Sequence, residues 1–184
     1  MKDWKLWKII LLCIGTYIGL GLIFTITLFG ATGQISEIFG SSSDWPFLWI
    51  NYTLGHSLLS PGLKILYAAD IGVGGDILLM VLILIMLLPG MISSILVGLF
   101  AKNSKVAFRV VFLFFITLSA VTIVLYVFDI YLVALDMIFN LVPGFFGLSK
   151  AVVILILTMI GVSQSIIHGG IAGQIRNLIK RKQR

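Results

Sequence analysis

Four long runs without a charged residue constrain this sequence more than any other feature. A helix needs about 20 consecutive apolar residues to cross the hydrocarbon core of a bilayer. Lipid offers the backbone no hydrogen-bond partners, so a run of this kind must satisfy its own N–H and C=O groups as a helix. The four runs, each predicted to be a transmembrane helix, are Ile9–Phe29, Ile77–Ala101, Val110–Phe128 and Ala151–Ile175.

The composition supports the same conclusion. Of the 184 residues, 60% are hydrophobic and only 11% are charged, whereas soluble domains are about half apolar and about a quarter charged. The mean hydropathy is +1.16. We therefore predict an all-α fold in which residues 1–184 form a single membrane domain, a polytopic bundle of four transmembrane helices.

Two further uncharged runs fit a spanning helix poorly. Trp45–Leu63 is interrupted by Pro46 and Pro61 and carries several polar side chains, and Met137–Ser149 is short and contains Pro143. We expect both to be interfacial or re-entrant segments, with a fifth span at Trp45–Leu63 as the open alternative. The outer loops that contain them are predicted to cover residues 30–76 and 129–150.

The placement of Lys and Arg predicts the orientation in the membrane. Eleven of the thirteen basic residues fall in the N-terminal segment, the link between the second and third runs, and the tail 176–184. Short cytoplasmic segments are enriched in Lys and Arg, so both termini are predicted to be cytoplasmic in a multi-pass protein of the plasma (cytoplasmic) membrane. Six of the seven acidic residues fall on the opposite side: Glu37, Asp44, Asp70, Asp76, Asp129 and Asp136.

The net charge of +6 follows from these basic segments. A basic residue near an anionic membrane surface gains about 1 kcal/mol, so the tail is expected to anchor the topology and meet lipid headgroups. No aromatic residues are interleaved with the tail's charges, and nucleic acid is not an expected partner.

Small residues recur every four positions in three of the predicted helices. Residues four apart share a helix face, and small side chains there let two membrane helices approach closely. A shift of 71 residues superimposes the second stripe on the fourth helix, which indicates either a parallel internal repeat like those of some transporters or a shared packing need. The predicted packing residues are Gly15 and Gly19, then Gly90, Ser94 and Gly98, and finally Gly161, Ser165, Gly169 and Gly173.

Gln164 and His168 form a polar pair beside the last stripe. They lie four residues apart on one face, and Arg176 follows His168 by about 12 Å along the helix axis. Ionisable residues inside a membrane are functional candidates, but a hydrogen-bonding role between helices is the favoured interpretation, because no charged residue lies in any of the four runs. Whether the pair faces a packed helix or a wet cavity stays open.

Asp76 and Asp129 are predicted to lie at the same outer membrane level. The stretch Gly72-Val73-Gly74-Gly75-Asp76 resembles the Gly-x-Gly-Asp motif of intramembrane aspartyl proteases, in which two aspartates activate a water. It departs from that motif at Val73. A carboxylate at a helix N-terminus also explains Asp76 without any catalytic role.

Other residues limit the site types further. The one cysteine, Cys13, excludes an intrachain disulfide, and two histidines are too few for most metal sites, so neither a metal nor another cofactor is expected. The topology resembles that of tetraspan proteins such as claudins and tetraspanins, whose outer-loop disulfides a single cysteine cannot form. Asn51, in the triplet Asn51-Tyr52-Thr53, is a candidate glycosylation site.

Three functions fit these patterns. The first is a non-enzymatic membrane protein, a structural or assembly subunit whose partners are the bilayer and other membrane subunits or further copies of itself. The second is a subunit of a small-solute transporter or channel. The third is an enzyme at the outer interface that uses Asp76 and Asp129.

Overall fold

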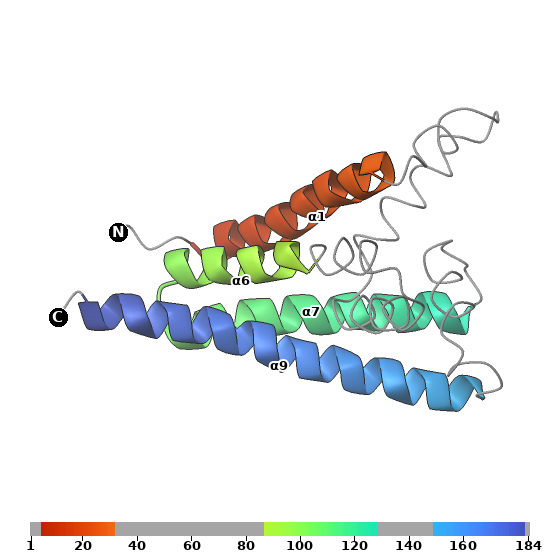
Figure 1. Cartoon of the computed structure of the whole chain (residues 1–184). Coiled ribbons are helices and arrows are strands. Elements are labelled where there is room, and N and C mark those ends of the chain that lie inside the picture. The colour runs from red at the N-terminus through yellow and green to blue at the C-terminus, as the bar shows by residue number, and fades with distance from the viewer. Residues whose placement is uncertain (1–4, 32–86, 129–148, 183–184) are drawn as a thin grey trace, which may run out of the picture.

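A computed structural model describes residues 5–31, 87–128 and 149–182, and within these ranges every regular element is a helix. Helices α1, α7 and α9 are each long and apolar enough to cross a membrane, while α6 is shorter. The predicted all-α fold is therefore confirmed for the described residues, three of whose helices could span a membrane. The predicted segment 45–63 and all but the last residue of the predicted segment 137–149 lie outside the described residues. The four helices are α1 (Leu6–Ala31), α6 (Leu88–Phe100), α7 (Ser104–Val127) and α9 (Lys150–Lys182) (Figure 1).

Helices α1, α7 and α9 all extend beyond the uncharged runs, and the last two do so by the larger margins. Helix α7 begins at Ser104, because Asn103 caps it: the Val106 N–H donates to Asn103 Oδ1 at 2.8 Å. Helix α9 continues through the predicted tail to Lys182, and its last turn is basic. Cations are favourable at a helix C-terminus, so the charges that end the apolar run also stabilise the end of the helix.

Helix α6 begins at Leu88, with Pro89 in its first turn. Proline has no N–H to donate and is tolerated at this position of a helix but not in its interior. The 13 residues of α6 cover about 20 Å at 1.5 Å per residue, which is shorter than a bilayer core. Residues 77–86, the predicted first part of this span, lie outside the described residues.

The four helices lie side by side in one bundle. Helix α9 packs along both α7 and α6, whereas α1 packs mainly on α6. Both chain termini lie at the end of the bundle where α6 is joined to α7 (Figure 1). The second half of α1 leans away from α7 and α9, so the closest packing lies toward the end that holds the termini.

Glycines occupy the closest approaches between α9 and its neighbours. A Cβ on Gly98 would lie 2.6 Å from the carbonyl oxygen of Ala172, and one on Gly161 would lie 2.5 Å from Ser119 Cβ. A Cβ on Gly169 would lie 3.0 Å from a ring carbon of Phe108. The absence of a side chain at these positions is what lets the helix backbones come so near.

The backbone contact at Gly98 predicts a strong effect of one methyl group. Gly98→Ala is expected to destabilise the bundle by about 1–3 kcal/mol, because the Ala172 carbonyl cannot move aside as a side chain would. Gly170→Ala is the matched control, since a Cβ there meets no described atom within 4 Å, and it should be neutral or stabilising by up to about 1 kcal/mol. Unfolding in detergent, followed by circular dichroism, measures both; equal stability of the two variants would contradict the close approach.

Candidate functional site around His168

Gln164 and His168 lie one turn apart on the face of α9 that packs into the bundle, and each is only 7% exposed. Their burial places them between helices rather than against lipid. The pair therefore faces packed helices, and its two side chains have different surroundings.

The imidazole of His168 is held by two other helices. Its Nδ1 lies 3.1 Å from the Ser94 hydroxyl of α6. Its ring stacks on Phe115 of α7, with centroids 4.3 Å apart and planes 19° from parallel. A Cβ on Gly90 would lie 3.1 Å from His168 Cε1, so the glycine makes room for the ring.

The hydrogen-bond pattern favours one neutral tautomer of His168. The Ser94 hydroxyl has a single hydrogen, which it donates to the Gly90 carbonyl oxygen at 2.7 Å. Its oxygen is then left to accept the Nδ1–H of His168, so the proton of the neutral ring sits on Nδ1. The contact is thus satisfied without a charged partner, as a buried group in an apolar medium requires.

Phe115 extends the contact to the remaining helix. Tyr17 of α1 meets Phe115 edge-on, with centroids 5.5 Å apart and planes at 87°. Both Tyr17 and Phe115 are completely or almost completely buried. We call Tyr17, Ser94, Phe115 and His168 the His168 node; it is the place where side chains of all four described helices meet.

Gln164 differs from its neighbour. Neither its Nε2 nor its Oε1 has a hydrogen-bond partner among the described residues, although both atoms are buried. An unpaired amide in such a place costs free energy. The polar pair predicted from the sequence is therefore one satisfied histidine and one amide without a described partner.

Most buried hydroxyls near these residues are satisfied within their own helices. Ser119, Thr122 and Ser165 each donate to the carbonyl oxygen four residues earlier, at 2.7–3.0 Å. Ser94 does the same and is fully buried. A nucleophile must reach its substrate and have an oriented base. The Ser94–His168 pair is enclosed between helices, so its geometry is that of a packing contact.

Arg176 belongs to the packed face and was missed from the sequence, where it only marked the start of the tail. It is 5% exposed, and its guanidinium donates to the carbonyl oxygens of Leu99 and Lys102, both at 3.3 Å. These carbonyls lie at the C-terminal end of α6, where helix oxygens lack intrahelical donors and a cation is favoured. Arg176 continues the spacing of Gly169 and Ala172, which is the signal that could have identified it.

The other predicted site residues separate into two groups. In the α6 and α9 stripes, Ser165 is fully buried, and a Cβ on Gly173 would meet the Ser104 carbonyl oxygen at 3.5 Å. Gly15 and Gly19 have no described atom within 4 Å of a Cβ, so they do not share in this packing. Asn51, Asp76 and Asp129 lie outside the described residues.

No family model, no curated protein and no solved structure matches this chain. Its function therefore has to be inferred from its own residues and their arrangement.

The His168 node predicts a measurable coupling between α6 and α9. Ser94→Ala and His168→Leu, combined in a double-mutant cycle, should show a coupling free energy of about 0.6–1.7 kcal/mol, the range for hydrogen bonds between membrane helices. Reversible unfolding in mixed micelles measures it. Ser94→Ala paired with Thr158→Val is the control, because Thr158 is exposed and donates within α9. That pair should be additive within about 0.5 kcal/mol; additivity of the first pair as well would contradict the contact.

Proposed function

We propose that this chain is a non-enzymatic integral membrane protein that acts as an assembly subunit. The observation that carries the proposal is the position of Gly15 and Gly19 on α1. They are spaced four residues apart in an apolar helix, and a Cβ on either would meet no described atom within 4 Å. The stripes of α6 and α9 are used inside the bundle, whereas this one has no neighbour among the described residues.

The glycine face of α1 points away from the bundle. Ile9, Cys13 and Tyr17 are almost fully buried and mark the inward side of the helix. With 3.6 residues per turn, Gly15 and Gly19 lie on roughly the opposite side. Small residues facing outward allow a second membrane helix to approach the backbone, which is the geometry of Gly-x-x-x-Gly association.

The surroundings of the glycines fit a helix partner. Leu11 and Ile26 are exposed on the same side of α1. These large apolar side chains lie next to the glycines, so a partner helix would contact them as well as approach the backbone closely. We propose that the partner is a further copy of this chain or another membrane subunit.

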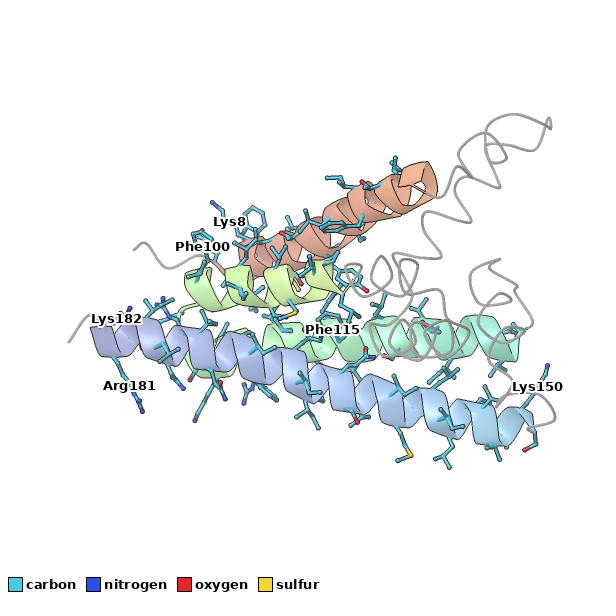
Figure 2. The ribbon with its side chains drawn as sticks, in the orientation of Figure 1. Lys8, Phe100, Phe115, Lys150, Arg181 and Lys182 are labelled. Atoms are coloured by element: carbon cyan, nitrogen blue, oxygen red, sulfur yellow. The ribbon has the colours of Figure 1, made fainter. Side chains whose placement is uncertain are left out.

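We also propose four spans with both termini in the cytoplasm, in the plasma membrane. Support comes from the distribution of charge. Of the ten Lys and Arg among the described residues, only Lys150 lies away from the end of the bundle that holds the termini. Figure 2 shows Lys8, Arg181 and Lys182 at that end and Lys150 at the other. Enrichment of this kind marks the cytoplasmic side of membrane proteins.

Assembly through α1 predicts that bulk on the glycine face separates the subunits. Gly15→Leu and Gly19→Leu should shift the protein, purified in mild detergent, toward the mass of one 20.2 kDa chain, because the added side chains hold the partner backbone away. Light scattering after size exclusion, corrected for detergent, measures the mass. Co-purifying proteins, if the partner is another subunit, should be lost from the same variants.

Ala120→Leu is the matched control, since it adds similar bulk at an exposed position on α7. It should leave the mass and the co-purifying proteins unchanged. A wild-type protein that is monomeric and without partners, or glycine variants that assemble like Ala120→Leu, would contradict the proposal.

A subunit of a small-solute transporter or channel is the second candidate. One observation favours it: the buried amide of Gln164 has no described partner, and a water or solute is one way to satisfy such a group. Asp76 and Asp129 have no described surroundings, so no observation favours the enzyme hypothesis.

Gln164→Leu separates the two candidates. If Gln164 is a buried amide without a transport role, the variant should be more stable by about 1–3 kcal/mol, since an unpaired polar group is removed. Wild-type liposomes should then be no more permeable than empty ones in a stopped-flow swelling assay. Permeability to water or small neutral solutes that the wild type confers and Gln164→Leu abolishes would instead establish the transport function.

A further inference from the structure

All the charged residues in the described part of the chain are cationic. It contains ten Lys and Arg residues and no Asp or Glu, because all seven acidic residues lie outside these ranges. Cations at the basic end of the bundle therefore have no carboxylate partner among the described residues. They are Lys5, Lys8, Lys102, Lys105, Arg109, Lys180, Arg181 and Lys182.

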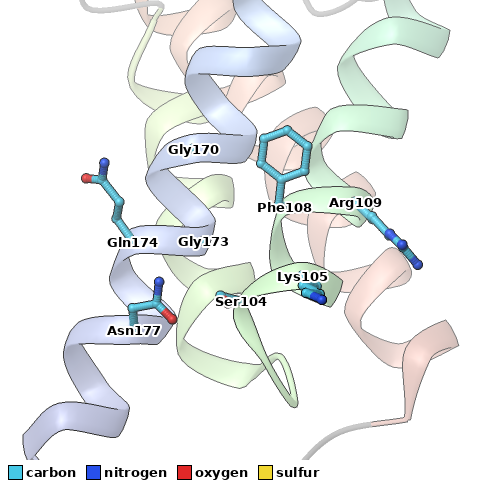
Figure 3. A pocket seen from close by; sticks show the side chains of 8 residues that line it. All are labelled: Ser104, Lys105, Phe108, Arg109, Gly170, Gly173, Gln174 and Asn177. Atoms are coloured by element: carbon cyan, nitrogen blue, oxygen red, sulfur yellow. The ribbon is translucent and has the colours of Figure 1, made fainter.

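A polar pocket of about 360 Å³ lies at this end, between the start of α7 and the last turns of α9. Lys105 and Arg109 line it from α7, one turn apart and both exposed. Asn177 lines it from α9, and Gly170 and Gly173 leave the α9 side without bulk (Figure 3). Cationic pockets between membrane helices at the interface bind the headgroups of anionic lipids.

An apolar groove of about 450 Å³ lies on the other side of α7, against α1. Ile10 and Ile14 line it from α1, and Val110 and Leu113 line it from α7. Its lining on α7 extends from position 106 to 117, about 16 Å at 1.5 Å per residue. That is about half of a 30 Å hydrocarbon core, the depth of one leaflet.

Arg109 lines both the polar pocket and the apolar groove. The Arg109 side chain therefore borders both spaces, which lie on different faces of α7, one with polar side chains in its lining and the other with an apolar lining. We propose that this combined site binds one anionic glycerophospholipid. Its phosphate headgroup lies in the polar pocket beside Lys105 and Arg109, and an acyl chain lies in the groove between α1 and α7.

The charge of the site selects an anionic lipid over a zwitterionic one. Lys105 and Arg109 attract the phosphate of either, but they repel the positive amine of a zwitterionic headgroup. The apolar groove selects a lipid over a soluble anion, since a free phosphate would leave the groove unfilled. The site uses a different face of α1 from the assembly proposal, because Gly15 and Gly19 lie on average about 140° around the helix from Ile10 and Ile14.

Native mass spectrometry of the delipidated full-length protein tests the site. It is titrated with phosphatidylglycerol and with phosphatidylcholine of identical acyl chains. The first phosphatidylglycerol should bind about 25-fold more tightly, given about fivefold for each of the two cations. Arg109→Gln should lower that affinity about fivefold and leave phosphatidylcholine binding unchanged.

Three further variants locate the two halves of the site. Gly170→Leu places its Cβ where no described atom lies within 4 Å, and its longer side chain should fill the pocket and lower phosphatidylglycerol binding. Leu113→Trp should fill the groove and weaken both lipids. Lys150→Gln, at the other end of the bundle, is the charge control and should change neither.

Two results would overturn the proposal. One is an equal effect of Arg109→Gln and Lys150→Gln on phosphatidylglycerol binding, which would mean that only overall charge matters. The other is full displacement of phosphatidylglycerol by excess inorganic phosphate, which would identify a site for soluble anions. Both Arg109 and Lys150 are exposed, so these two variants should stay folded, as circular dichroism can verify.

Discussion

The arrangement of the helices depends on the need to satisfy one imidazole away from water. A buried polar group is stable only with hydrogen-bond partners, and this holds more strictly in an apolar medium. The His168 imidazole forms a hydrogen bond with the Ser94 hydroxyl of α6 and stacks on the Phe115 ring of α7. Both contacts are directional, so they fix the rotation and the height of three helices at once. Phe115 passes the same constraint to α1 through Tyr17.

Close backbone contacts at glycines and a cap on α6 also hold the helices together, in addition to the His168 node. Glycines beside Ala172 and Ser119 bring the backbones of α6 and α7 against α9. Farther along α9, Arg176 donates to carbonyl oxygens at the end of α6. Helix α6 has only 13 described residues, and helices of this length gain most of their stability from packing. Its position is therefore held by a hydrogen bond, a backbone contact and a cap, all from α9.

The sequence predicts helices α1, α7 and α9 and the inward face of His168. The side-chain contacts between helices could not be predicted, for physical reasons. Uncharged runs predicted α1, α7 and α9 because lipid requires helices, and the four-residue spacing placed His168 on an inward face. The partner of that histidine could not be predicted, because Phe115 is one of many aromatic residues in an apolar run. The inward side chain of Arg176 was equally hidden, since its charge suggested only the membrane edge. Gly15 and Gly19 share the spacing of the buried stripes, yet only the packing of α1 shows that they face outward.

The outward features of α1 divide the surface between two kinds of contact. On the side of Ile10 and Ile14, a groove leads to Arg109 at the cationic end of the bundle, where no carboxylate lies among the described residues. On another face of α1, Gly15 and Gly19 leave the backbone without a neighbour among the described residues. A lipid on the first side would fill the space between α1 and α7, where the helices have few direct contacts, and so stabilise the position of α1. Because that position sets the direction of the glycine face, lipid binding and assembly are expected to reinforce each other: a ligand that favours one arrangement of α1 increases the population that presents the same face to a partner.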